Sequence, residues 1–260
     1  MSLLEVENLT VRYPRRRSIF RAASPAALDE VSFEIPENAI VGLIGERGCG
    51  KTTLAHCIVR LLRPQSGKIL YRDNNILRLS TRAFRRNRRE IQLVFENCRR
   101  SLNPHVDILT TLLESIRVYN PKLSRSQRED YAARLLTRVG LPWETAFKFP
   151  RELPHGHAER VAIARAISVD TRLLLIDDSL RALDLRPQRE IVELLLGLQR
   201  ELGFSCLFAC HDFNHLLPVA KHALVMARGR IVESAAIDAI IDNPQHEFTK
   251  KLLASTLTLP

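Results

Sequence analysis

The spacing of apolar residues predicts strands in the first part of the chain. Val31, Phe33 and Ile35 alternate with polar neighbours, which is typical of a strand with one buried face. Residues 39–45 (AIVGLIG) form a short apolar run that ends in glycine, as expected for a strand that is buried on both faces. A helical stretch is expected next, at residues 53–62 (TLAHCIVRLL). The chain therefore begins with a strand-rich region that leads into a helix.

Helical patterns dominate the middle of the chain, from about residue 100 to residue 170. Ser124 and Gln127 form a capping box ahead of a predicted helix at residues 125–139, and Gly140 is placed to end that helix. Further along, LPHGH (residues 153–157) leads into a predicted amphipathic helix, HAERVAIARA (residues 157–166), with which it shares its last residue. The middle of the chain is thus expected to be a helical region.

Strands and a helix alternate again in the last third of the chain. Residues 173–178 (LLLIDD) and 204–210 (FSCLFAC) predict buried strands, and residues 187–202 between them predict an amphipathic helix. Residues 223–233 (ALVMARGRIVE) predict a hairpin that turns at the arginine–glycine step. The alternation of strands and helices favours an α/β sheet with a helical insertion in the middle.

The composition is typical of a soluble protein whose cysteines are reduced. At 260 residues the chain is long enough for one large domain or for a core domain with a subdomain. Hydrophobic residues make up 45% and charged residues 26%, and no run approaches the ~18 apolar residues of a membrane span. The first residues show no signal-peptide pattern, so a cytoplasmic protein is expected. The five cysteines show no CxxC spacing and are expected to be free thiols.

The net charge of +10 leaves several interpretations open. Arginines cluster at residues 13–18, 82–90 and 99–100. Such clusters can form a binding site for a nucleic acid, an anionic membrane surface or an anionic ligand, or they can simply be solvated faces. Aromatic residues make up only 6% of the chain and do not interleave with the arginines, which argues against a platform for stacking bases. The charge alone decides nothing.

Residues 45–52 (GERGCGKT) carry the strongest chemical signal. They match the phosphate-loop pattern G-x-x-x-x-G-K-[ST] and lie between a predicted buried strand and a predicted helix. Glycines let successive backbone N–H groups face the phosphates, and the helix that follows adds a favourable dipole. Lys51 would reach the outer phosphates, and the Thr52 hydroxyl would ligate Mg²⁺. The segment predicts a nucleotide site at Gly45, Glu46, Arg47, Gly48, Cys49, Gly50, Lys51, Thr52 and Thr53.

The acids of LLLIDD supply a partner for this loop. A carboxylate at the carboxyl end of a buried strand suits Mg²⁺, which it holds directly or through water. Asp177 takes this place in the sequence. The alternative is that two acids merely end the strand.

With these motifs in place, the chain resembles the ATP-binding subunits of ABC transporters over nearly its whole length. The resemblance rests on five segments in order: GERGCGKT, IQLVFENCRRSLNP, LPHGHAERVAIARA, LLLIDD with the RALD after it, and FACHD. RREIQLVFENCRRSLNP, the GLP after the middle helix and the tail NPQHEFTKKLL are most similar to the branch that imports peptides and nickel, including Sap-type peptide systems. Some peptide-importer subunits carry a C-terminal cysteine cluster. No cysteine follows Cys210 here, so an iron–sulfur cluster is not expected.

The resemblance also implies how the chain is organised. It implies a single ATP-binding domain over residues 1–260, with a P-loop NTPase sheet core, an N-terminal antiparallel β subdomain and an inserted helical subdomain. Residues 1–100 would form the β-rich, ATP-binding part and residues 101–165 the helical subdomain. Residues 166–260 would complete the core and the tail. Tyr13 matches the aromatic residue that stacks on adenine, and His211 matches the histidine that contacts the γ-phosphate.

The segment LPHGH stands where this family usually has LSGGQ at a helix start. There the helix start binds the γ-phosphate of an ATP held by the opposite subunit, which is anion binding by exposed N–H groups at a helix N-terminus. Proline lacks the hydroxyl and the N–H, the first histidine limits close backbone approach, and the second can donate a hydrogen bond or, when protonated, carry a charge. The alternative is that both histidines are exposed loop residues. The matching residues are Leu153, Pro154, His155, Gly156 and His157.

Three further positions depart from the family pattern. Asp178 stands where a glutamate usually polarises the attacking water, and its carboxylate is one bond, roughly 1.5 Å, closer to the backbone. A misplacement near 1 Å can cost about 10²-fold in rate. Glu96 lies in the lid segment, within IQLVFEN, where the family usually has a glutamine. A glutamate there can still ligate Mg²⁺, but it adds negative charge near the phosphates. Arg181 replaces a small serine at the contact between subunits.

The resemblance implies an ATPase subunit that powers the uptake of peptides or a related small solute. Its helical region would dock onto membrane permease subunits at the cytoplasmic face of the inner membrane, with a solute-binding protein as an indirect partner. The departures leave open a second function, a nucleotide-binding scaffold or regulator with little turnover. A soluble protein acting on nucleic acid is disfavoured, because one nucleotide domain is present without a tandem copy. Since Asp178 affects the chain's own site and LPHGH the partner's site, a heterodimer with a second ATP-binding subunit is predicted.

Overall fold

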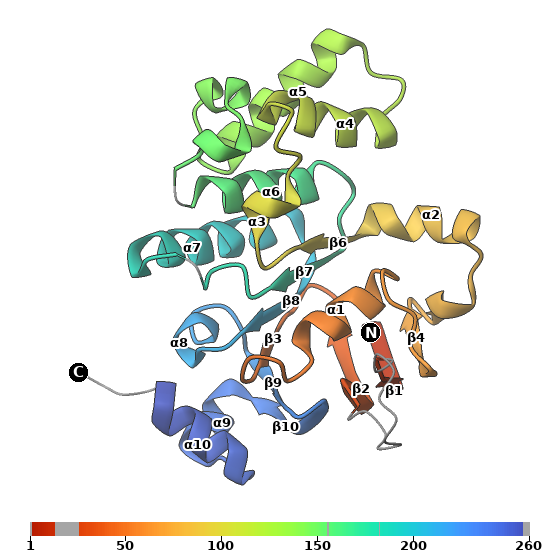
Figure 1. Ribbon diagram of the computed structural model, residues 1–260, viewed down its shortest axis with the longest axis vertical. Coiled ribbons are helices and arrows are strands. Elements are labelled where there is room, and N and C mark those ends of the chain that lie inside the picture. The colour runs from red at the N-terminus through yellow and green to blue at the C-terminus, as the bar shows by residue number, and fades with distance from the viewer. Residues whose placement is uncertain (1, 14–25, 155, 182, 257–260) are drawn as a thin grey trace, which may run out of the picture. The chain divides into compact units, whose positions relative to one another are not determined.

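The computed structural model describes residues 2–13, 26–154, 156–181 and 183–256. The chain forms two compact units. The first unit comprises Met1–Arg85 and Ser205–Pro260, and the second comprises Arg86–Phe204. Both contain strands and helices (Figure 1), as the α/β prediction requires. Within the described ranges, no helix combines the length and the apolar character needed to cross a membrane.

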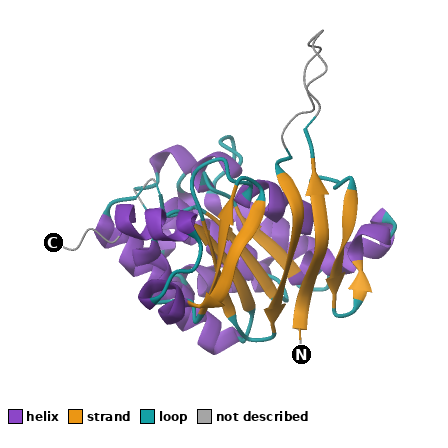
Figure 2. Ribbon diagram, turned by 90° about the horizontal axis from the view of Figure 1, so that it is seen from below, coloured by secondary structure: helices purple, strands orange, loops and turns teal. Residues whose placement is uncertain are grey.

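An antiparallel sheet in the first unit confirms the predicted N-terminal β subdomain. Its strands run in the order β2-β1-β4-β5 and lie side by side in Figure 2. They are β1 (Ser2–Val11), β2 (Leu28–Pro36), β4 (Ser66–Tyr71) and β5 (Asn74–Asn75). In β2, Val31 and Ile35 are buried and Phe33 is half-buried, so the alternation seen in the sequence marks the inner face of this strand.

A second set of strands in the first unit holds the predicted buried strand. This strand, β3 (Ile40–Ile44), pairs in parallel with β8 (Ser205–Cys210) and β9 (His222–Ala227). β10 (Arg230–Ala236) pairs with β9 in antiparallel fashion. The turn between them has φ of 47° at Arg228 and 81° at Gly229, as a two-residue hairpin turn requires to match the strand twist. The predicted hairpin is confirmed.

The helix after the phosphate loop is shorter than the sequence predicts. α1 spans Lys51–Ile58, whereas the apolar pattern extends to residue 62. Arg60 has a left-handed φ of 57°, and the N–H groups of Leu61 and Leu62 donate to the carbonyl of His56 at 2.8 and 3.1 Å. These bonds satisfy the carbonyl of His56 at the end of α1, and the left-handed residue directs the chain out of the helix. The other helices of the first unit are η1 (Ile76–Arg78), α8 (Phe213–Leu216), α9 (Ile237–Asp242) and α10 (Glu247–Thr256).

The second unit confirms the predicted helical middle of the chain. Two parallel strands, β6 (Ile91–Val94) and β7 (Leu173–Asp177), lie beside helices packed in layers (Figure 1). The helices are α3 (Cys98–Ser101), α4 (Ile108–Tyr119), α5 (Arg125–Arg138), α6 (His157–Ile167) and α7 (Leu185–Leu202), with 3-10 turns η2 (Trp143–Phe147) and η3 (Pro150–Glu152). The chain passes from the first unit to the second within α2 (Thr81–Glu90). α7 begins two residues before its predicted start, with Pro187 in its first turn.

α5 shows how closely local sequence signals fix an element. The Ser124 hydroxyl accepts a hydrogen bond from the Gln127 N–H, and the Gln127 side chain accepts one from the Ser124 N–H. This is the predicted capping box. Gly140 has a φ of 69°, and the Leu141 N–H donates to the Leu136 carbonyl at 2.8 Å. The helix therefore starts at the predicted residue and ends one residue before the predicted end.

α6 is not the amphipathic helix that the sequence predicts. It packs against α3, α4, α5 and β6, and eight of its eleven residues are buried, among them Glu159. Its two arginines are half-buried, and their guanidinium groups are satisfied by backbone carbonyls. Arg160 bonds to Val139 at 2.8 Å and Arg165 to Ser101 at 3.2 Å. α6 is therefore a core helix of the second unit.

Candidate functional site

The phosphate loop lies between β3 and α1, in the context that the motif requires. Gly48 and Gly50 have φ of 78° and 121°, which residues with a Cβ adopt only with strain. A Cβ on Gly45 would come within 2.2 Å of the Met226 carbonyl oxygen, and one on Gly50 within 2.5 Å of the Ala27 carbonyl oxygen. The backbone of this loop thus has a conformation that favours glycine. Two of its glycines also pack so closely against neighbouring backbone carbonyls that a side chain would not fit.

Lys51 is held inside this loop. Its side chain is buried, and Nζ donates to the carbonyl oxygens of Gly45 at 2.6 Å and Glu46 at 3.1 Å. A buried ammonium group requires such partners, because an unpaired buried charge is costly. The loop therefore carries a fixed positive charge among its own backbone groups, beside the N-terminus of α1, where an anion is favoured.

The hairpin turn braces the phosphate loop, a contact that the sequence does not reveal. The Gly229 N–H donates to the Cys49 carbonyl at 2.8 Å, and the Asp29 N–H donates to the Gly229 carbonyl at 2.8 Å. Burial raises the pKa of the Cys49 thiol, and the Lys51 charge opposes this only in part. Cys49 is therefore a protonated, packed thiol. All five cysteines of the chain are free and buried, as expected.

Two residues assigned to the nucleotide site by sequence lie in contact. Tyr13 follows β1 with 49% of its surface exposed, and its hydroxyl lies 3.1 Å from the Thr53 hydroxyl on α1. The neighbouring Arg12 backbone exchanges two hydrogen bonds with the Gln65 side chain, at 2.8 and 2.9 Å. The end of β1 is therefore fixed beside the first turn of α1, and the tyrosine ring remains accessible to a base.

His211 follows β8 in the first unit. Its ring lies edge-on to the ring of His215, with centroids 6.1 Å apart. His215 is buried in α8. The His211 ring therefore lies beside His215 just after the carboxyl end of β8, and its contact with a γ-phosphate stays a prediction.

The two adjacent acids at the end of LLLIDD differ in their surroundings. Asp177 ends β7 with its side chain buried. Asp178 is half-buried and has a left-handed φ of 47°, a conformation that aspartate tolerates better than most residues. The segment that follows is held by the Gln188 amide, which donates to the carbonyls of Leu180 and Leu183 at 3.1 and 2.9 Å. The backbone that follows Asp177 and Asp178 is therefore held in place by these hydrogen bonds.

Two departures from the family pattern meet each other. Glu96 Oε1 lies 3.6 Å from Arg181 Nη1 in an ion pair. The sequence flagged each position separately and gave no sign of the pairing. The lid segment (residues 95–101) is held from its other end as well. Arg99 Nη2 donates to the Leu153 carbonyl at 2.6 Å, and the Ser101 carbonyl accepts from Arg165.

The helix start at LPHGH is part buried and part exposed. Leu153 is buried, Pro154 is exposed, and Gly156 caps α6 with a left-handed φ of 81°. His155 lies outside the described residues. The His157 N–H donates to the Pro154 carbonyl at 3.2 Å. The His157 ring is half-buried, and its Nδ1 finds no hydrogen-bond partner among the described residues.

The His157 ring is neutral at physiological pH. Burial lowers its pKa from the ordinary value, and the charges of Arg160 and Lys148 lower it further. Of the two roles that the sequence leaves open for this residue, a neutral hydrogen-bond donor is favoured over a cation.

This shift makes a prediction about stability and pH. Because the folded-state pKa of His157 lies below the unfolded value, the unfolded chain binds the proton more readily, and stability is lost as the pH falls below about 6.5. His157→Gln should therefore make the fall in stability from pH 7.5 to 5.5 shallower. Urea unfolding midpoints of both proteins at the two pH values measure this. An equal or steeper fall in the variant would contradict it.

Comparison with known proteins decides the family. A family model described as "ABC transporter" matches residues 28–181. The chain belongs to the ABC transporter family. As a member it is an ATP-binding subunit of an ABC transporter, and it binds and hydrolyses ATP. The matched residues include the phosphate loop, the lid segment, LPHGH, Asp177 and Asp178.

Curated relatives and a solved structure agree with this family. The chain is 36% identical to the "probable peptide ABC transporter ATP-binding protein y4tS" of Sinorhizobium fredii, over 98% of this chain and 72% of that protein. It is 34% identical to the "glutathione import ATP-binding protein GsiA" of Pectobacterium atrosepticum, over 97% of this chain but only 41% of the relative's length. The dimeric ATP-binding cassette MJ0796, bound to ADP and Pi, superposes with a TM-score of 0.79 at 25% identity, covering 90% of this chain and 98% of that one. The P-loop NTPase fold expected from sequence is confirmed.

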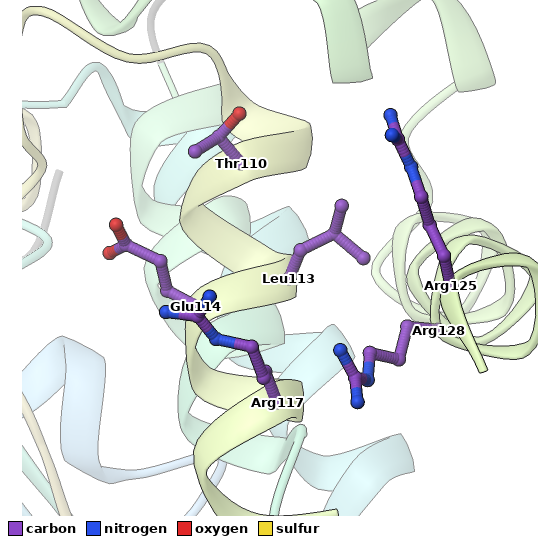
Figure 3. A pocket seen from close by; sticks show the side chains of 6 residues that line it. All are labelled: Thr110, Leu113, Glu114, Arg117, Arg125 and Arg128. Carbon is purple, nitrogen blue, oxygen red and sulfur yellow. The ribbon is translucent and has the colours of Figure 1, made fainter. Parts of the chain in front are cut away.

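A pocket on the helical part of this ABC subunit gathers positive charge. It has a volume of about 260 Å³ and lies between α4 and α5 (Figure 3). Arg125 Nε donates to Glu129 at 2.9 Å and Arg128 Nη2 to the Pro121 carbonyl at 3.1 Å, so both side chains are partly fixed. The lining residues are Thr110, Leu113, Glu114, Arg117, Arg125 and Arg128.

Proposed function

We propose that this chain is the ATP-hydrolysing subunit of a peptide importer, with low turnover at its own site. The observation that carries the proposal is the glycine-shaped phosphate loop with a buried lysine inside it. The substrate class follows from the relatives, one named for peptides and one for glutathione import. ATP would be held by residues 45–53, with the Tyr13 ring available to stack on the adenine.

Mg²⁺ is the cofactor that these residues fit. Magnesium prefers hard oxygen ligands and keeps several waters, so few protein groups are needed. The Thr52 hydroxyl, the buried Asp177 carboxylate and the Glu96 carboxylate are such ligands. When bound, the ion would neutralise charge on the phosphates during transfer. The His211 ring would add a hydrogen bond to the γ-phosphate.

Asp178 is the proposed base, and its short side chain would lower the turnover. Its carboxylate stands on a stem one bond shorter than that of glutamate, and a base must lie within hydrogen-bond reach of the attacking water. Aspartate tolerates the left-handed φ at this position better than glutamate does. The turn is therefore less strained, but the carboxylate extends less far toward the attacking water.

Asp178→Glu should raise ATP turnover about fivefold, because it restores the reach of the carboxylate. The gain stays below the 10²-fold that a 1 Å misplacement can cost, since glutamate tolerates the left-handed φ less well. Asp178→Asn removes the base and should lower turnover below that of the wild type. Phosphate release at saturating Mg·ATP measures all three proteins. Equal rates in all three would remove Asp178 from the mechanism.

The chain would work in a heterodimer with a second ATP-binding subunit. Its own site would carry the Asp178 defect, and the partner's site would carry the LPHGH defect, whereas a homodimer would combine both defects twice. The helical part would dock on permease subunits at the cytoplasmic face of the inner membrane. There the arginine pocket between α4 and α5 would suit acidic groups of the permease. A solute-binding protein would deliver the peptide, and no nucleic acid is expected.

A scaffold or regulatory subunit with little hydrolysis is the second candidate. The ion pair of Glu96 with Arg181 favours it, because this pair replaces the amide and the small side chain that active subunits of the family use. The two candidates differ in whether this chain's own phosphate loop must turn over for transport.

Reconstitution tests the proposed function. The chain would be co-purified with its permease and sister ATPase subunits and placed in liposomes with the solute-binding protein. Uptake of a labelled tripeptide that needs ATP and this chain supports a peptide importer. Transport that persists when only this chain's loop is inactivated supports the scaffold. ATP hydrolysis without uptake of any peptide tested would contradict the substrate class.

A further inference from the structure

The register of two strands brings Glu96 and Arg181 together. β6 and β7 pair in parallel, with Val94 opposite Ile176. Glu96 follows β6 by two residues, and Arg181 lies in the turn after β7. Parallel strands end at the same edge of a sheet, so the segments that leave them are neighbours. The 3.6 Å separation of the two charged groups follows from this arrangement.

Both backbones that carry the pair are anchored. On the lid side, Arg99 holds the Leu153 carbonyl at 2.6 Å. On the other side, Gln188 holds the carbonyls of Leu180 and Leu183. The two side chains are 48% and 34% exposed, for Glu96 and Arg181 respectively. They therefore face solvent at the edge of the sheet where Asp177 ends β7, rather than the core.

We propose that Arg181 is a positioning residue for Glu96. Its guanidinium holds the lid carboxylate and offsets its negative charge, so that a carboxylate can serve beside the phosphates of ATP. This inference rests on the proposed function, because it needs nucleotide phosphates near Glu96. Like charges repel across a distance of a few ångströms, and a paired cation removes most of that repulsion. Arginine suits the task because it stays charged at every physiological pH.

The role of the pair is electrostatic rather than structural. Ion pairs exposed to this degree contribute little to folding stability, so the effect of breaking the pair should appear in ATP affinity. The chain supplies a matched control in the same unit. Arg138 Nη2 lies 2.8 Å from Glu201 Oε1, with exposures of 37% and 51%. Arg138 has no part in the proposed site.

A double-mutant cycle on the full chain tests the proposal. The dissociation constant for Mg·ATP would be measured by calorimetry for the wild type, Arg181→Ser, Glu96→Gln and the double variant. Arg181→Ser should weaken binding about fivefold in the wild-type background, because it leaves the carboxylate uncompensated. It should change binding by less than about twofold in the Glu96→Gln background, since no charge then needs an offset.

Two further variants separate position from structure. Arg181→Lys keeps the charge and should recover most of the affinity that Arg181→Ser loses. Arg138→Ser breaks the matched pair and should leave the dissociation constant unchanged. Salt at 0.5 M should shrink the effect of Arg181→Ser, because partly exposed charges are screened. Melting temperatures of all variants should stay close to that of the wild type.

Several results would overturn the proposal. Equal effects of Arg181→Ser in the two backgrounds would show that Arg181 acts without Glu96, for instance at the subunit contact. No effect in either background would show that the pair is idle. A loss in Arg138→Ser as large as in Arg181→Ser would show a general effect of net charge. Failure of the wild-type chain to bind Mg·ATP would overturn the proposed function itself, which is a distinct outcome.

Discussion

Lys51→Ala removes the stabilisation of this protein by ATP. The wild-type chain, at an ATP concentration 100 times its dissociation constant, should gain about 2.7 kcal/mol of unfolding free energy. The variant should gain nothing measurable, because it lacks the ammonium group that is held inside the loop and that would face the phosphates of bound ATP. Thermal unfolding with and without Mg·ATP measures this, and ATP hydrolysis should be lost with it.

A control separates the loop from a general loss of positive charge. Lys68 lies on β4 in the same unit, with a half-exposed side chain paired to Glu7 at 2.8 Å. Lys68→Ala should keep the full ATP-dependent shift. Lys51→Ala should also be less stable than the wild type without ATP, since two loop carbonyls lose their donor. A Lys51→Ala protein that ATP still stabilises fully would refute the phosphate-loop assignment.

The parts of the site that the sequence predicts are those encoded in short, continuous segments. The glycines and the lysine of the phosphate loop lie within eight residues, and each has a local reason to be there. The hairpin turn at Arg228 and Gly229 and the capping box of α5 are local in the same sense. For such features, conformational preference and sequence spacing carry the whole signal.

The parts that the sequence misses depend on contacts between distant segments. The polar residues of α6 imply an exposed face, but Arg160 and Arg165 are partly buried because backbone carbonyls from other elements accept their hydrogen bonds. The bracing of Cys49 by Gly229 joins residues 180 positions apart. Neither periodicity nor a motif contains this information.

Glu96 and Arg181 show the same limit at the site itself. Each position departs from the family pattern, and each alone reads as a defect. Their separation in sequence hides the pairing, which arises from the parallel register of β6 and β7. The neutral state of the His157 ring is likewise set by burial and by Arg160 and Lys148. Local sequence therefore supplies candidate site residues, whereas packing determines which of them pair and whether the His157 ring is charged.

Restoring the helix start at LPHGH should accelerate ATP hydrolysis at the partner's site. Pro154 is exposed at the start of α6, and the carbonyl before it is held by Arg99, so a serine placed there has a fixed backbone. Pro154→Ser supplies a hydroxyl and an N–H, and His155→Gly permits closer approach of the backbone. A hydrogen bond to a charged group contributes about 1.5–3 kcal/mol. The double change should therefore raise turnover at the partner's site at least about tenfold.

We expect this effect to act in trans, and the heterodimer tests it. In this family the helix start faces the γ-phosphate held by the other subunit, so ATP binding to the isolated chain should not change. ATP-dependent dimerisation should tighten, as sedimentation of the heterodimer would show. Hydrolysis would be assayed with the phosphate-loop lysine removed from one subunit at a time, Lys51 in this chain or its counterpart in the partner. Stimulation should require the partner's intact loop. Equal stimulation with only this chain's loop intact would show that LPHGH acts on its own nucleotide.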